Sequence, residues 1–221
     1  MIKKEELTVK IGGIADLISS IEKAKSELKS KVDGVYADKS RTQKWKDAQI
    51  ESYKKMTKTK IDELRSEIAE NLAEIEEYAG RPFDFTQKPE LDAQIDYLTT
   101  MHSSGCLSDG MISSVLDGYK GHEAVLLYMR QKLTAAGINE HHFDNRIFGT
   151  FDKDFNTGKT IYTPGSQFFR ELNDTIARGT SLPLTLHGLN QLQEILGVES
   201  TGVKNLTAEV EARAVEHPPV M

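Results

Sequence analysis

The chain has 221 residues, of which 28% are charged and 38% hydrophobic, with a formal net charge of −6. No apolar run of a signal peptide follows Met1, and no stretch approaches the roughly 18 consecutive apolar residues of a membrane span. The single cysteine, Cys106, excludes an intramolecular disulfide. Together these features predict a protein that is cytoplasmic, or assembled from a cytoplasmic pool, and that has no membrane partner.

Charge is unevenly distributed along the chain. Residues 1–80 contain 16 Lys/Arg and 16 Asp/Glu, whereas residues 81–221 contain 12 and 18. The first part is therefore much denser in charge, as expected for an extended, solvated helical element. The second part is long enough to form a core of its own. We therefore expect an N-terminal helical arm over residues 1–80 and a globular helical domain over residues 90–216.

The predicted arm begins with an extended segment and continues as a helical hairpin. Leu7, Val9 and Ile11 alternate with polar residues, and Gly12-Gly13 is expected to end this segment. Apolar residues at helical spacing predict a helix over 14–32, which Asp33-Gly34 should interrupt. A long helix is then predicted over 39–78, with Gly80 as C-cap and Pro82 as a stop signal.

The long helix is split by charge. Residues 39–60 contain eight Lys/Arg against Asp47 and Glu51, whereas residues 61–78 contain seven Asp/Glu against Arg65 alone. This order opposes the helix macrodipole, which favours anions near the N-terminus and cations near the C-terminus. The split therefore predicts a complementary charged surface outside this helix, on another helix, another copy of the chain or a charged polymer.

A short heptad pattern runs through the acidic half. Ile61, Ile68 and Ile75 fill one seam position, and Leu64, Asn71 and Tyr78 fill the other. Just over two heptads do not specify a free-standing coiled coil. Packing against the preceding helix explains the seam at least as well as packing against a partner.

The rest of the chain predicts a mainly α fold with one small β-hairpin. Residues 81–89 form a linker with two prolines, and residues 217–221 form a flexible tail. Aromatic and β-branched residues around Asn156-Thr157-Gly158 predict a hairpin near residues 147–162. Helices are expected over 89–102, 108–116, 122–136, 166–178, 185–196 and 206–215.

Motifs for catalysis or cofactor binding are incomplete. The segment ending in Gly158-Lys159-Thr160 lacks the earlier glycine of a phosphate-binding loop, because Lys153 occupies that position. Asp152, Asp154 and Asn156 have the spacing of calcium ligands without the Gly and Glu of an EF-hand loop, so ion binding there stays open. We therefore expect no enzyme, no cofactor and no small-molecule substrate.

Histidines and the cysteine give no complete site either. His102 and Cys106 are four residues apart, but no zinc-site pattern brings in His122, His141 or His142. Cys106 as a nucleophile would need a histidine and an orienting group nearby, which the sequence does not place. The role of Cys106 therefore stays open.

Two kinds of partner are compatible with the arm. Two long helices lying antiparallel would place each basic half against an acidic half, with apolar contacts supplying most of the binding and charge selecting the orientation. Residues 23–60 also hold twelve Lys/Arg against five acidic residues, with aromatics between them, which suits nucleic acid. The residues predicted to bind a protein partner are Trp45, Tyr53, Ile61, Leu64, Ile68 and Ile75; those predicted for nucleic acid are Lys39, Arg41, Lys44, Lys46, Lys54 and Lys55.

The layout resembles small helical proteins that tailed phages and prophages encode among their head and assembly genes. The resemblance is carried by the charged N-terminal helix, the turn Asp117-Gly118-Tyr119-Lys120-Gly121-His122 and the acidic helical C-terminal part. It implies a non-enzymatic structural role, as a capsid-associated or assembly component, and a place in the virion if a phage encodes the chain.

Overall fold

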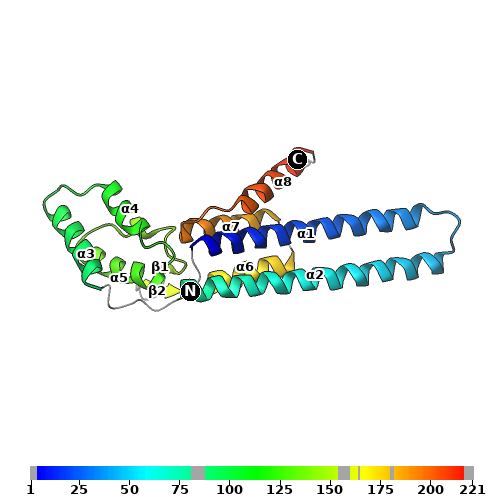
Figure 1. Ribbon diagram of the computed structural model, residues 1–221, viewed down its shortest axis with the longest axis horizontal. Coiled ribbons are helices and arrows are strands. Elements are labelled where there is room, and N and C mark those ends of the chain that lie inside the picture. The colour runs from blue at the N-terminus through cyan, green and yellow to red at the C-terminus, as the bar shows by residue number, and fades with distance from the viewer. Residues whose placement is uncertain (1–3, 81–87, 154–159, 164, 180–181, 217–221) are drawn as a thin grey trace.

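The computed structural model describes residues 4–80, 88–153, 160–163, 165–179 and 182–216, which are mainly helical as predicted (Figure 1). Within these ranges, no helix combines the length and the apolar character needed to cross a membrane. The helices are α1 (Lys4–Ala37), α2 (Gln43–Ala79), α3 (Lys88–Ser103), α4 (Asp109–Asp117), α5 (Glu123–Ala135), the 3₁₀ helix η2 (Glu140–Phe143), α6 (Ser166–Arg178), α7 (Leu182–Leu196) and α8 (Thr201–Glu216).

The long predicted helix is continuous. α2 begins at Gln43 because Thr42 has extended backbone angles and its side chain accepts a hydrogen bond from the Trp45 amide at 3.4 Å. It ends at Gly80, whose amide donates to the Glu76 carbonyl at 2.9 Å. The predicted C-cap is thus confirmed, and the start lies four residues later than predicted.

The prediction for the first helix was wrong in two places. α1 runs without interruption through Gly12-Gly13 and through Gly34, and the segment from Leu7 to Ile11 that was predicted to be extended is helical. Leu7, Ile11 and Ile14 lie at helical spacing, and each is fully buried in the core. The burial of this apolar face outweighs the poor helix propensity of glycine, so the segment is helical from Lys4.

Gly12 also has a packing role. A Cβ atom on Gly12 would lie 2.8 Å from the Ser200 Oγ, and one on Gly202 of α8 would lie 2.7 Å from the Gly12 carbonyl oxygen. α1 and α8 therefore pack backbone against backbone at these two glycines. The glycine that suggested a chain break instead permits a close helix crossing.

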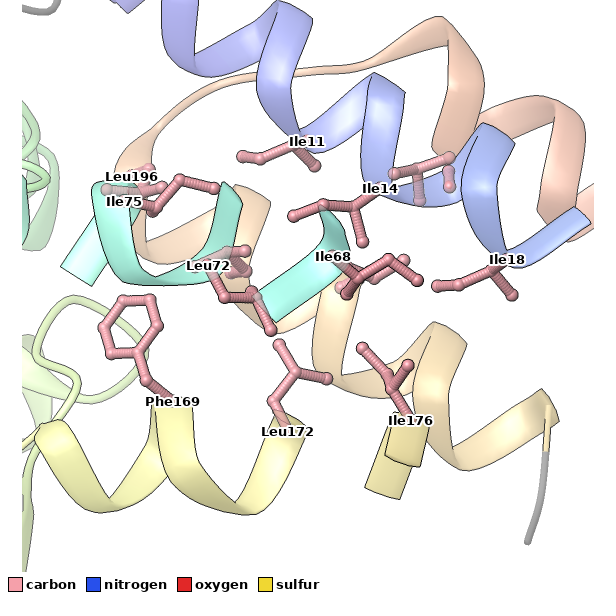
Figure 2. Packing of buried hydrophobic residues seen from close by; sticks show 14 of the residues in the cluster. Ile11, Ile14, Ile18, Ile68, Leu72, Ile75, Phe169, Leu172, Ile176 and Leu196 are labelled. Carbon is pink, nitrogen blue, oxygen red and sulfur yellow. The ribbon is translucent and has the colours of Figure 1, made fainter. Parts of the chain in front are cut away.

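The main core joins the base of the α1–α2 hairpin to α6, α7 and α8. Figure 2 shows its side chains converging from α1, α2, α6 and α7. Ile14, Ile68, Ile75 and Leu189 are fully buried, and Phe148 adds an aromatic contact to Phe169 with ring centroids 4.9 Å apart. This core fixes the base of the hairpin.

A second core belongs to α3, α4, α5 and η2. It is built around Leu98, Leu116, Leu126 and Met129, which are all fully buried. The helix predicted over 108–116 is present as α4, and the Ser108 side chain caps it by accepting from the Met111 amide at 3.4 Å. The sequence predicted that a linker at residues 81–89 divides the hairpin from one globular domain. In the structure, α6–α8 share their core with the hairpin, whereas α3–α5 form the other core. Residues 81–87 lie outside the described residues.

Two short strands connect the segments that build the two cores. β1 (Thr150–Lys153) pairs antiparallel with β2 (Thr160–Thr163), with Thr150 opposite Thr163. Residues 154–159, which include Asp154 and the predicted turn Asn156-Thr157-Gly158, lie outside the described residues. Just before β1, Ile147 enters the second core and Phe148 the main core, so consecutive residues tie the two together.

The hairpin extends beyond the main core. The buried residues of α1 after Ala24 reduce to Val35, and those of α2 before Ile68 reduce to Ile50. Figure 1 shows these parts of α1 and α2 projecting past α6 and α7 as a two-helix rod. From here on, the arm means residues 26–60 alone, which is the projecting part of the arm predicted over residues 1–80. The remainder of the hairpin together with α6–α8 is the body.

Candidate docking arm

The charge boundary in α2 coincides with the point where the arm leaves the body. The arm contains ten Lys/Arg and five Asp/Glu, a net charge of +5, which leaves −11 for the rest of the chain because the whole carries −6. Ile61 is the first residue of α2 packed against the main core, and the acidic half of α2 follows it. A basic rod therefore projects from an acidic body.

Part of the charge split is compensated inside the hairpin. Because α1 and α2 are antiparallel, the negative C-terminal end of α1 lies beside the basic N-terminal end of α2. There the Lys46 ammonium donates a hydrogen bond to the Tyr36 carbonyl oxygen at 3.0 Å. At the base, Lys10 of α1 pairs with Glu74 of α2 at 2.6 Å. The surface predicted to complement α2 is thus, in part, its own neighbour α1.

The tip of the arm is an ordered turn. The Asp38 carboxylate accepts hydrogen bonds from the Ser40 amide at 2.8 Å and from the Ser40 hydroxyl at 2.6 Å. The Arg41 guanidinium lies 3.8 Å from the same carboxylate and 5.0 Å from the centre of the Trp45 ring. Trp45, which is 39% exposed, thus packs against a turn that is itself held by hydrogen bonds.

Asp38 gives this turn a dependence on pH. Hydrogen bonds from the Ser40 hydroxyl and amide, together with the charges of Arg41 and Lys46, lower the pKa of Asp38 below its ordinary value. The ionised form is therefore favoured in the folded turn. Its contribution is present above the ordinary pKa of an aspartate and is lost as the pH falls through the lowered value.

We expect an NMR titration of the Ser40 amide to have its midpoint below the ordinary aspartate pKa. The Ser40→Ala change removes the hydroxyl donor, so it should move the midpoint upward while leaving the amide as a reporter. An unchanged midpoint in Ser40→Ala would contradict the assigned cause.

Two of the predicted partner-binding residues are inaccessible. Ile68 and Ile75 are each 0% exposed and lie in the main core, while Ile61 and Leu64 are half-buried against the same core. The heptad seam thus packs on the chain's own helices, the alternative that the sequence left open. The assignment of Ile68 and Ile75 to a partner surface is corrected accordingly.

The arm exposes other large apolar side chains. Tyr36 is 57% exposed and Met56 is 67% exposed, whereas Tyr53 is half-buried with the Lys31 ammonium 5.5 Å from its ring centre. Met56 was not predicted as a contact residue. The sequence feature that could have indicated it is a large apolar residue that follows two lysines and lies outside the heptad seam.

The basic residues predicted for nucleic acid fall into two groups. Two of them already have contacts in the tip. Arg41 lies against Asp38 and the Trp45 ring, and Lys46 donates to the Tyr36 carbonyl. The other four are exposed and form no ion pair within the part of the chain that the structure describes. They are Lys39, Lys44, Lys54 and Lys55.

A cavity of about 630 Å³ lies between the two cores. In its lining, Arg130 pairs with Glu140 at 2.6 Å and His141 with Asp144 at 3.1 Å, and Glu194 lies there as well. Across the described ranges, no three His, Cys, Asp or Glu side chains gather as metal ligands would. Cys106 is exposed near the end of α3. The arm therefore offers the more distinctive candidate surface.

Comparison with protein-family models, with curated proteins and with solved structures finds no match for this chain. The function is therefore inferred from the geometry and charge of the arm.

Proposed function

We propose that the chain is a non-enzymatic structural protein that docks onto another protein through the arm. The observation that carries this proposal is that a rod clear of the main core exposes Tyr36, Trp45 and Met56 along a basic surface. None of these three side chains belongs to the main core or to the second core. They are suited instead to contact with a second surface.

The arrangement of the tip favours docking. Aromatic residues are enriched among the side chains that dominate protein interfaces, and Trp45 is the strongest such anchor here. The hydrogen bonds of Asp38 and the stacking of Arg41 order the tip before any partner arrives, which reduces the entropy lost on binding. The surrounding lysines would steer an acidic partner towards the arm.

The same layout supports assembly as the setting for this docking. A projecting arm on a compact helical body suits a component that links copies or neighbours within a larger particle. A phage head or its assembly intermediates are one such particle, in keeping with the resemblance described above.

A second candidate function is nucleic-acid binding. It is favoured by the four exposed lysines that no described carboxylate pairs, of which Lys54 and Lys55 are consecutive. Such binding would depend on phosphate contacts and would weaken steeply with salt.

The native complex recovered from the chain's own source separates these functions. We expect the tagged chain to retain a protein in fixed proportion after nuclease treatment, and the double variant Tyr36→Ala, Trp45→Ala to lose it. Met101→Ala, a partly buried residue of α3 away from the arm, serves as the matched control. A nuclease-sensitive complex that is lost when Lys44, Lys46, Lys54 and Lys55 are changed to Glu would instead establish the nucleic-acid function.

A further inference from the structure

We propose that the partner of the arm is a second copy of the chain, with the two α2 helices antiparallel about a two-fold axis near Ile61. This inference rests on the proposed docking function and names its partner. It follows from the position of the charge boundary, from a continuous line of exposed side chains along α2 and from what packs against the inner side of that helix.

The charge boundary lies at the middle of the helix. α2 extends from Gln43 to Ala79, so its central residue is Ile61, and the basic half ends at Lys60. The two halves therefore have nearly equal length. Only an antiparallel pair centred there sets each basic half against an acidic half along the whole helix, whereas a parallel pair would oppose like charges.

The sides of α2 that face its own chain are already occupied. Ile61, Leu64 and Ile68 pack within the main core, and α2 contacts α1 along the hairpin and α6 at the base. The rest of the helix surface is exposed, and one line of exposed side chains runs along its whole length. It consists of Trp45, Ala48, Ser52, Met56, Thr59, Glu63, Glu67, Glu70, Glu74 and Glu77. Glu74 also pairs with Lys10 of α1 at 2.6 Å.

These residues follow one another at spacings of three and four, so they form a single stripe along the helix. The arm half of the stripe carries two of the exposed apolar residues, Trp45 and Met56, flanked by Lys55 and Lys60. The body half carries five glutamates. In the antiparallel pair, Trp45 and its neighbour Arg41 would reach the acidic end of the partner helix.

The structure also changes the expected character of this pairing. Because the apolar seam is used inside each chain, charge and the contacts of Trp45 and Met56 must carry the association. Ion pairs at exposed sites weaken as salt shortens the Debye length below its value of about 10 Å at 0.1 M. We therefore expect a dimer that is favoured at low salt and weakened at high salt.

Cross-linking tests the orientation directly. In full-length chains with Cys106→Ser, a thiol at Thr59→Cys lies close to the proposed axis and should cross-link to itself through a short bis-maleimide. Two copies of Ala48→Cys would be separated by about 40 Å along the helix, at ~1.5 Å per residue, and should not cross-link to each other. A mixture of Ala48→Cys and Glu74→Cys should cross-link across the pair.

Charge reversal tests the mechanism. Lys55→Glu should increase the dissociation constant measured by sedimentation at low salt several-fold, and adding Glu67→Lys should restore it. Lys54→Glu changes the same net charge about 100° away around the helix, so it should leave the dissociation constant within two-fold. Unchanged circular dichroism of each variant confirms that it is folded.

A monomer at tens of micromolar and low salt, or self-cross-linking of Ala48→Cys, would overturn the antiparallel pair. The proposed docking function would survive that result if the native complex still held a different protein through Tyr36 and Trp45. It would fail separately if the alanine variants of these residues retained the complex.

Discussion

The Ile68→Ala variant is expected to lose about 2–5 kcal/mol of unfolding free energy, the usual cost of truncating a buried isoleucine. Ile68 is fully buried where side chains from α1, α2 and α6 meet, as Figure 2 shows. Removing its outer carbons leaves a cavity that these helices cannot close without shifting α1 and α2 against α6. Urea unfolding followed by far-ultraviolet circular dichroism measures the loss.

Alanine variants of two other residues of α2 give unfolding free energies with which the Ile68→Ala value can be compared. Ile61→Ala truncates a half-buried side chain at the edge of the core and should cost less. Met56→Ala changes an exposed residue and should stay within about 0.5 kcal/mol. If Ile68→Ala and Met56→Ala unfolded at the same urea concentration, the seam of α2 would not belong to the chain's own core.

The second large effect is expected at the crossing of α1 and α8. In Gly202→Ala the new methyl group would lie 2.7 Å from the carbonyl oxygen and 2.9 Å from the Cα atom of Gly12. Both atoms belong to the backbone of a long helix, so α8 must move away as a unit. Overpacking of this kind typically costs about 1–3 kcal/mol, and thermal unfolding should show the corresponding fall in the midpoint.

Gly13 supplies a matched control one residue from the crossing. A Cβ atom there meets no heavy atom within 4 Å, and the residue is helical. Gly13→Ala should therefore raise the unfolding free energy by roughly 0.5–1 kcal/mol through helix propensity. Equal effects of Gly13→Ala and Gly202→Ala would show that α1 and α8 do not approach closely in solution.

Local sequence signals were sufficient to predict where individual helices begin and end. The sequence predicted the start of α6 at Ser166, the start of α4 near Ser108 and the end of α2 at Gly80. The prediction for Gly12 was wrong because glycine occurs both where a helix ends and where two helices cross closely. The crossing depends on Gly202, which lies 190 residues later, and no local pattern reveals it.

The candidate site shows the same limit. The charge boundary of α2 was predicted from the sequence, and Trp45, predicted as a contact residue, is partly exposed in the structure. The sequence did not show which surface covers Ile68 and Ile75. An apolar stripe has the same residue pattern whether a helix of the same chain or a partner protein covers it. The antiparallel course of α1 also explains part of the charge order, through Lys46 at the tip and Glu74 at the base.

The slender interior of the arm has a consequence for its motion. Among the residues of the arm, only Val35 and Ile50 are buried, so few apolar contacts oppose fraying of the two helices. Proteins open locally where such contacts are scarce, and the free energy of that opening is below the global value. The distal rod can therefore loosen while the base stays folded, and whatever binds the closed rod will also rigidify it.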